Sequence, residues 1–179
     1  FDVSILELAA VKGMFSVLVD EPVSYVNAPV LAGDRGVESS LSAEGEYEDH
    51  RSLVRVAVAC SDGCRFSAAA TVSGLRDEPK LVEIDGAEVD VPVSEHLLVF
   101  RYADKPGVVG AVGGGLGDAG VNIANMQVSR SLEAVTMVLS VDSTVADEVV
   151  EGIVGAIDAS VARAGGSEGA ARIPAHPVK

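Results

Sequence analysis

The sequence predicts an α+β protein made of two successive parts, the first built around an antiparallel sheet. Residues 38–90 alternate between apolar and polar side chains with a period of two, which is typical of half-buried strands. Apolar side chains recur at helical spacing before and after this stretch. Apolar residues make up 48% of the 179 residues and charged residues 22%, a balance that indicates a globular chain with a hydrophobic core.

The chain is expected to open with a helix. Ser4 precedes Glu7 by three residues, as in a capping box, and the apolar spacing that follows continues until Pro22. A short strand is predicted over residues 23–26, followed by a small helix that ends at Gly36.

Two β-hairpins are predicted next, and together they make an antiparallel sheet of four or five strands. Their strands and turns are expected at residues 53–60 and 65–74 around a loop at 61–63, and at residues 81–84 and 87–93 around a turn at Asp85 and Gly86.

The second part is expected to begin near Ser94. Its predicted elements are a strand at 97–102, a helix at 106–118, strands at 121–129 and 134–141, and a helix at 146–161. This order lacks the last strand of the ferredoxin-like β-α-β-β-α-β fold. Residues 171–173 are the best candidate for that strand, although the tail from Gly165 is poor in strand-forming residues and is expected to be disordered.

The composition argues against two classes of protein, those that bind nucleic acid and those that span a membrane. The chain has 27 Asp and Glu against 13 Lys and Arg, a net charge of −14, which disfavours binding to nucleic acid. No apolar run approaches 18 residues, so no membrane span is predicted. Cys60 and Cys64 are expected to be free thiols beside a turn in a reducing cytoplasm. Because the chain starts at Phe1 and no signal peptide is visible, we expect it to be part of a longer polypeptide.

Several apparent motifs do not predict chemistry. Residues 115–120 match G-x-G-x-x-G, but here the motif closes a helix, whereas a dinucleotide site needs it to open one. The glycines of this helix are instead expected to permit close packing. His50, His96 and His176 have no nucleophile or metal ligand at a diagnostic spacing. We therefore predict no catalytic residue and no metal site.

The loop from Tyr102 to Gly107 is the most informative segment. Pro106 is predicted in the first turn of a helix, where the backbone N–H groups of Gly107 and Val108 are free to bind a carboxylate. Asp104 beside them suits an ammonium group, and the two together describe a site for an amino-acid zwitterion. The alternative is that Asp104 only caps the helix, and spacing alone favours that alternative.

Two stretches in the second part resemble the ACT domain of D-3-phosphoglycerate dehydrogenases: residues 104–110 (DKPGVVG) and 120–130 (GVNIANMQVSR). Upstream, residues 26–29 (VNAP), 48–54 (EDHRSLV) and 84–86 (IDG) are similar to the intervening, allosteric-substrate-binding domain of the same enzymes. The resemblance covers residues 1 to about 163 and implies an intervening domain over residues 1–94, truncated at its start, an ACT domain over 95–163 and a flexible tail over 164–179.

The resemblance implies a regulatory role. In this family, paired ACT domains join their sheets edge to edge and bind L-serine, the feedback inhibitor, at the junction. The corresponding positions here are Tyr102 and Asp104 from one subunit and Asn122 from the other, and the donors predicted above, Gly107 and Val108, lie on the same loop as the first two. The zwitterion argument and the family role thus fall on the same loop, which reverses the preference for a simple cap.

The resemblance also implies a parent enzyme that oxidises 3-phosphoglycerate with NAD, using N-terminal catalytic domains that these residues lack; the fragment itself is expected to hold no cofactor. Lys80 stands at a candidate anion site of the intervening domain. Two other functions remain open: a module that serves only in assembly, and an ACT sensor of another small amino acid in a different biosynthetic enzyme.

Overall fold

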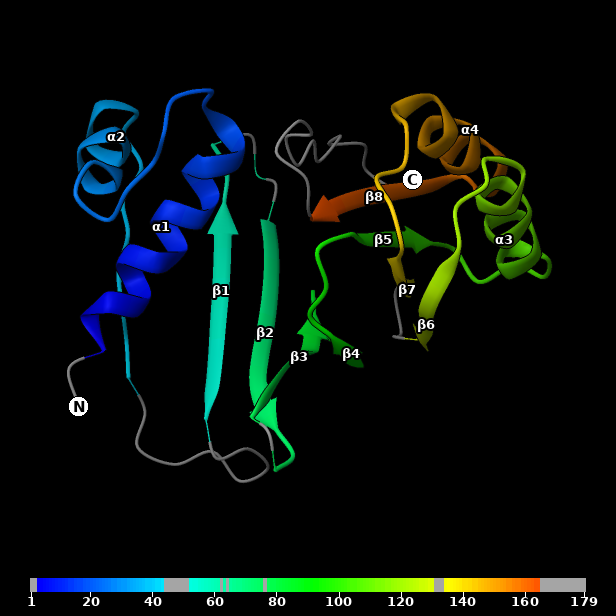
Figure 1. Cartoon of the computed structure of the whole chain (residues 1–179), viewed down its shortest axis with the longest axis horizontal. Helices are drawn as coiled ribbons and strands as arrows, with labels where there is room; N and C mark the ends of the chain where they lie inside the picture. The colour runs from blue at the N-terminus through cyan, green and yellow to red at the C-terminus, as the bar shows by residue number, and fades with distance from the viewer. Residues whose placement is uncertain are drawn as a thin grey trace. The chain divides into compact units, whose positions relative to one another are not determined.

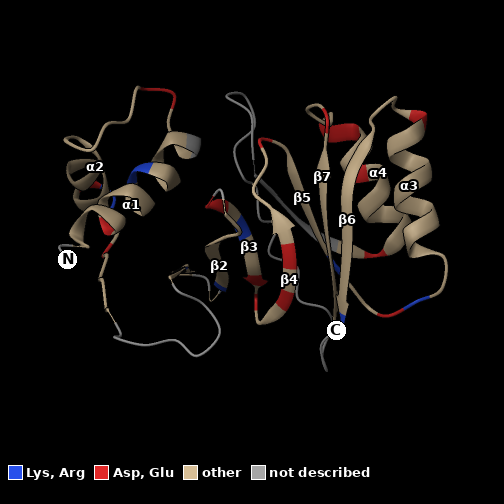
Figure 2. Cartoon of the chain, turned by 60° about the horizontal axis from the view of Figure 1, so that its bottom comes forward, with Lys and Arg blue, Asp and Glu red and all other residues tan. Residues whose placement is uncertain are grey.

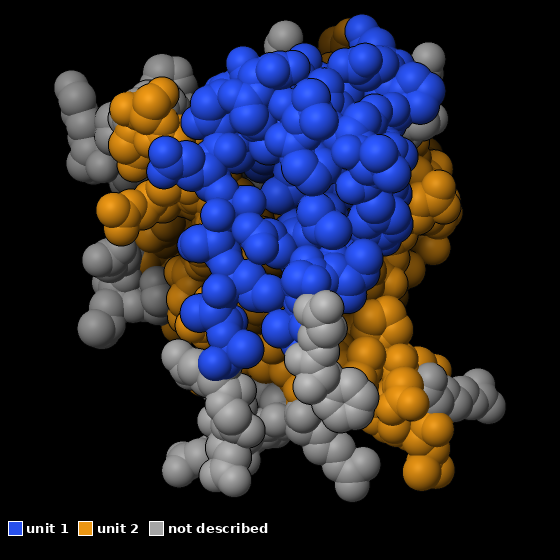
Figure 3. Space-filling model, turned by 90° about the vertical axis from the view of Figure 1, so that its left-hand side faces the viewer, with its two compact units in different colours: residues 1–49, 167–171 blue, residues 50–166, 172–179 orange. Residues whose placement is uncertain are grey.

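The computed structural model describes six segments of the chain: residues 3–43, 52–61, 63, 65–75, 77–130 and 134–164. For residues 17 and 160–164 it describes the backbone alone. By their contacts, the described residues form two compact units that divide after residue 49 (Figure 3). The predicted domain boundary at Ser94 lies within the second unit, between its two sheets, and stays a prediction.

The first unit contains α1 (Ser4–Leu18) and α2 (Ala28–Asp34). Its small core consists of Val11, Phe15, Ala28 and Ala32. Helix α1 already includes Ser4, so its N-cap residue is Val3 and not the predicted Ser4.

The predicted strand over residues 23–26 is wrong. This segment ends in a turn at residues 25–27, in which the Asn27 side chain accepts a hydrogen bond of 2.6 Å from the Ser24 backbone N–H. Such a local side-chain contact competes with extended structure. Gly36, with φ +66°, follows the end of α2 as predicted.

The first sheet of the second unit has four antiparallel strands in sequence order: β1 (Leu53–Ala59), β2 (Arg65–Ser73), β3 (Glu78–Ile84) and β4 (Ala87–Pro92) (Figure 1). Both predicted hairpins are present. The β3–β4 turn has positive φ at both central residues, Asp85 (47°) and Gly86 (77°), as a type I′ turn requires. The β1–β2 loop is five residues long and not three, because Ala59 pairs with Arg65.

The second sheet has the order β6-β7-β5-β8, which is the ferredoxin-like arrangement. Its strands are β5 (Leu97–Tyr102), β6 (Ile123–Arg130), β7 (Val135–Val141) and β8 (Ala159–Ala164). The missing last strand, the fourth of this sheet, is therefore β8, which pairs antiparallel with β5. The predicted candidate at residues 171–173 and the tail lie outside the described residues.

Helix α4 (Asp147–Ile157) ends earlier than predicted, because Asp158 adopts a left-handed conformation with φ +52° that terminates it. Val161, predicted to continue the apolar stripe of this helix, instead pairs with Phe100 in the sheet. No helix in the described part of the chain has the length and apolar character needed to cross a membrane.

Helix α3 (Val108–Asp118) starts two residues later than predicted, with Gly107 at its N-cap. Val108, Val112 and Leu116 face the core, whereas Val109 is 49% exposed. The helix ends at Gly120 as predicted: the Gly120 N–H donates to the Gly117 carbonyl and the Val121 N–H to the Leu116 carbonyl, both at 2.9 Å. These two bonds are those of a Schellman motif.

The second sheet is covered on both faces. Figure 2 shows α3 and α4 on one face and β3 and β4 on the other. On the helix side the core includes Leu98, Phe100, Met137 and Leu139. On the other side, buried residues of both sheets pack together; they are Ile84, Val89, Val91, Leu97 and Val138. All seven residues of β7 are buried as a result. The structure confirms the α+β class, with helices and two antiparallel sheets.

Candidate functional site

A cavity of about 410 Å³ lies where β5 leads into α3. It is lined by the loop between these elements, by the first residues of α3 and by the end of β6. The lining residues are Tyr102, Asp104, Lys105, Pro106, Gly107, Val108, Val109, Val128 and Arg130. Four of the five residues predicted to bind the ligand, Tyr102, Asp104, Gly107 and Val108, therefore share one cavity.

The backbone at the start of α3 supplies hydrogen-bond donors. Gly107 has φ +89°, a conformation that glycine adopts without strain. The Ala111 N–H donates to the Gly107 carbonyl at 3.0 Å and begins the helical bonding. The N–H groups of Val108, Val109 and Gly110 thus have no acceptor within the helix, and they lie at its positive end. This arrangement suits a carboxylate, although the donors sit one residue later than predicted.

Asp104 has a partner that sequence reasoning missed. The Arg130 Nε donates to Asp104 Oδ2 at 3.0 Å, and the two side chains are 69% and 61% exposed. An ion pair this open to solvent contributes little to stability. Asp104 does not cap α3, because the N-cap residue is Gly107 and no side chain makes a cap hydrogen bond there. Asp104 instead lines the cavity.

Strand register explains why Arg130 reaches this loop. Val135 of β7 pairs with Tyr102 of β5 on one side and with Arg130 of β6 on the other. Directly paired residues point to the same face of a sheet, so Tyr102 and Arg130 both start from the helix-covered face. Arg130 was part of the quoted ACT motif, but its approach to Asp104 depends on this register and not on sequence spacing.

Tyr102 is 3% exposed, and the charges of Asp104 and Arg130 both act on its hydroxyl. Burial raises the pKa of its hydroxyl above the ordinary value of 10.0, the Asp104 carboxylate raises it further, and the Arg130 guanidinium lowers it. The phenol therefore remains protonated at neutral pH and provides a neutral hydroxyl in the wall of the cavity.

Asn122 does not line this cavity. It is exposed and directly precedes β6, whereas Val128 and Arg130 lie at the other end of that strand. Eight residues of extended strand separate Asn122 from Arg130, which corresponds to roughly 26 Å. Its backbone N–H donates to Asp142 Oδ1 at 3.1 Å, so the position is held by the neighbouring loop. A role for Asn122 requires a second subunit and stays a prediction.

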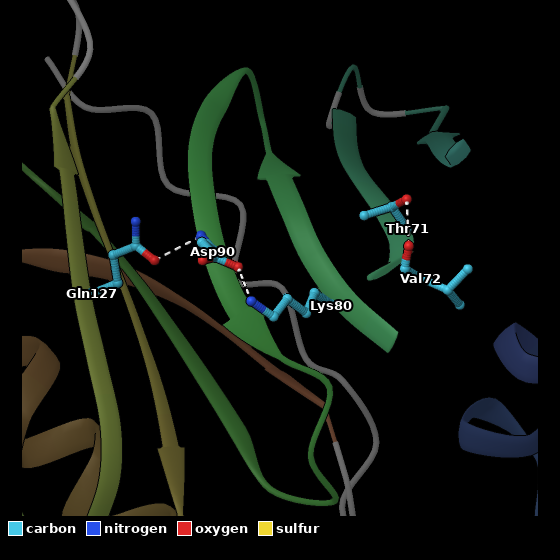
Figure 4. A network of polar contacts seen from close by, with 5 residues as sticks. All are labelled: Thr71, Val72, Lys80, Asp90 and Gln127. Carbon is cyan, nitrogen blue, oxygen red and sulfur yellow. Dashed lines mark hydrogen bonds and ion pairs between the residues drawn. The ribbon is translucent and has the colours of Figure 1, made fainter. Parts of the chain in front are cut away.

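Lys80, the candidate anion site, is paired with an acidic residue (Figure 4). Its Nζ lies 2.9 Å from Asp90 Oδ1, and its side chain is 29% exposed. The Asp90 backbone N–H donates at 2.6 Å to the side-chain oxygen of Gln127 on β6. Lys80 thus belongs to a polar contact that joins the two sheets, and an anion would have to compete with Asp90 for it.

The remaining candidates from the sequence are the cysteines and histidines. Cys60 is an exposed free thiol, while Cys64, His50 and His176 lie outside the described residues. Within the described ranges, no three His, Cys, Asp or Glu side chains gather as they would around a metal ion.

Comparison with known proteins assigns both parts of the chain. The model of the D-3-phosphoglycerate dehydrogenase intervening domain matches residues 1–85, and the model of the ACT domain matches residues 96–153. The chain is similar to D-3-phosphoglycerate dehydrogenases of Mycobacterium leprae (40% identical over 161 residues, 89% of this chain and 30% of the relative) and Methanocaldococcus jannaschii (34% over 152 residues, 83% and 28%). It thus spans about 30% of the length of these relatives.

Proposed function

Because this chain carries the two regulatory domains of D-3-phosphoglycerate dehydrogenases, the intervening domain and the ACT domain, we propose that it regulates and assembles such an enzyme by binding L-serine. In this proposal L-serine is the feedback inhibitor of a cytoplasmic pathway that makes it. The oxidation of 3-phosphoglycerate with NAD belongs to catalytic domains outside these 179 residues. The observation that carries the proposal is the cavity formed by the β5–α3 loop.

The cavity suits both charges of an amino acid. The Asp104 carboxylate accepts hydrogen bonds from the ammonium group, and charge assistance makes such bonds strong. The N–H groups at the start of α3 donate to the carboxylate, which the helix dipole also favours. The Tyr102 hydroxyl is a further polar group for a small side chain such as that of serine.

A second copy of the chain would complete the site. Strand β6 is at one edge of its sheet, and an exposed edge can pair with another strand. If two copies of β6 pair antiparallel about a two-fold axis, the beginning of each strand lies beside the end of the other. Asn122 of the partner subunit then approaches the cavity at Arg130, which accounts for its distance from Asp104 within one protomer.

Binding at such a junction supplies a mechanism for regulation. A ligand held by two subunits stabilises the arrangement in which both halves of the site meet. It can bias the enzyme only by as much as its affinity for this arrangement exceeds its affinity for the arrangement in which the halves are apart. Coupling energies between such sites are typically about 1–3 kcal/mol.

Calorimetric titration of the full chain with L-serine tests the proposal. We expect binding that Asp104→Ala and Asn122→Ala each weaken by about tenfold or more, since each removes a hydrogen bond to a charged group. Arg55→Ala is the matched control, because its ion pair with Glu83 lies outside the cavity. Unchanged affinity in both site variants would disprove the site assignment.

Sedimentation and thermal melting separate the remaining functions. A ligand that binds only the folded state raises the melting midpoint. A dimer whose melting midpoint no amino acid alters would indicate a module that serves only in assembly. A shift with another amino acid and none with L-serine would indicate a different sensor. A monomer at every concentration would remove the two-subunit site.

A further inference from the structure

We propose that Arg130 is a specificity-determining residue of this cavity: its guanidinium receives the carboxylate of an α-amino acid whose ammonium takes the place of Arg130 on Asp104. The inference rests on the proposed function, because it concerns the same ligand site. It adds a recognition residue from β6 to a site otherwise built from the β5–α3 loop.

The geometry of the pair fits this exchange. Arg130 and Asp104 are joined by one hydrogen bond, from Nε to Oδ2 at 3.0 Å, and both line the cavity. In an α-amino acid a single carbon atom separates the ammonium from the carboxylate. A ligand that inserts its two charges between Arg130 and Asp104 therefore meets an opposite charge at each end.

The guanidinium of Arg130 is better suited to bind a carboxylate than a simple point charge would be. A guanidinium presents several donors in a planar fork that matches the two oxygens of a carboxylate. The N–H groups at the start of α3 donate from fixed positions, whereas the Arg130 side chain is 69% exposed and can follow the ligand. The two kinds of donor can thus act on the same carboxylate.

Little stability is lost when the pair opens. Exposed ion pairs contribute little to stability, so the ligand displaces a weak contact. For the same reason, replacing Arg130 should leave the fold intact, which allows its effect on binding to be measured directly.

Two ligands distinguish this role. L-Serinamide keeps the ammonium and the side chain of L-serine but replaces the carboxylate with a neutral amide. The full chain, Arg130→Gln, Arg130→Lys and the control Arg55→Gln are titrated with both ligands in a calorimeter. We expect Arg130→Gln to weaken L-serine binding by about tenfold or more and to change serinamide binding by less than about threefold. Arg130→Lys should retain part of the preference for L-serine, because it keeps the charge but not the fork.

The outcomes are separable. If the unmodified chain binds L-serine and Arg130→Gln changes both ligands by the same factor, Arg130 does not read the carboxylate and only this inference fails. Tighter binding of both ligands to Arg130→Gln would show that Arg130 merely blocks Asp104, and would also overturn it. If the unmodified chain binds neither ligand, the proposed function fails together with the inference.

Discussion

Gly115 of α3 lies directly against the side chain of Ile153 on α4. A β-carbon added at position 115 would come within 2.7 Å of Ile153 Cγ1 and 3.1 Å of Cδ1. Real contacts of this kind are essentially never so short, so this glycine sets the distance between the two helices. The packing role expected for the glycine-rich helix thus holds at Gly115, whereas an added β-carbon at Gly113, Gly114 or Gly117 meets nothing within 4 Å.

Gly115→Ala and Gly114→Ala should therefore change stability in opposite directions. Overpacking at position 115 is expected to lower the free energy of unfolding by about 1–3 kcal/mol. At position 114, where space is open, alanine should raise it by up to about 1 kcal/mol through helix propensity. Urea unfolding of the two variants measures both effects. Equal changes in both variants would contradict the packing argument.

Tyr102 should make stability depend on alkaline pH. Because its pKa is higher in the folded chain than the ordinary value of 10.0, the folded state keeps a proton that the unfolded chain loses. Its contribution is complete below pH 10 and is lost as pH rises through the folded pKa. Thermal melts between pH 9 and 12 should show a smaller alkaline loss in Tyr102→Phe, with exposed Tyr25→Phe as the control.

The charges beside Tyr102 should move its titration in known directions. Asp104→Asn removes a negative charge that raises the Tyr102 pKa, so phenolate absorbance should appear at lower pH than in the unmodified chain. Arg130→Gln removes a positive charge that lowers the pKa, so absorbance should appear at higher pH. Identical titration curves in the two variants would mean that neither charge acts on this hydroxyl.

The contact between the two sheets should depend more on Gln127 than on Lys80. Gln127→Met removes the acceptor of the Asp90 backbone N–H and should cost about 0.5–1.5 kcal/mol. Lys80→Met removes only the partly exposed ion pair with Asp90 and should cost about 0–1 kcal/mol. Chemical unfolding compares the two, and a larger loss in Lys80→Met would reverse our ranking of these contacts.

The left-handed backbone at Asp158 should discriminate between substitutions. Valine is strained at φ +52° and glycine is not, so Asp158→Val should be about 1–2 kcal/mol less stable than Asp158→Gly. Both variants lose the 3.4 Å ion pair with Lys105, so their difference isolates the backbone. Equal melting midpoints would indicate that α4 does not end by this conformation.

The end of α4 at Asp158 is also a feature of the fold that could not be predicted from the sequence. Local periodicity located both hairpins and the four helices of the described segments, but it extended α4 through Val161, because that residue continues the apolar stripe by chance. The strand that follows is stabilised by pairing with β5, a tertiary contact that no local pattern records. The predicted strand at residues 23–26 failed for the opposite reason, since Ser24 and Asn27 bond locally.

Some residues of the candidate site could likewise be predicted from the sequence, and others could not. The loop with Asp104 and Gly107 could be predicted, because a helix start after a strand leaves a recognisable pattern. Arg130 could not, because its position depends on two strand pairings through Val135. Asn122 directly precedes β6, at the end of the strand that is remote from the cavity, and only the assembly of two chains would connect it to the cavity.

Strands β3 and β4 cover one face of the second sheet, and this cover matters for isolating the part of the chain that holds the cavity. A polypeptide starting at residue 95 would lose that cover and leave Leu97, Val99 and Val138 facing water. Such a surface is prone to self-association. The smallest soluble piece that retains the cavity beside the β5–α3 loop should therefore begin upstream of β3, even though the residues that line this cavity all lie beyond residue 100.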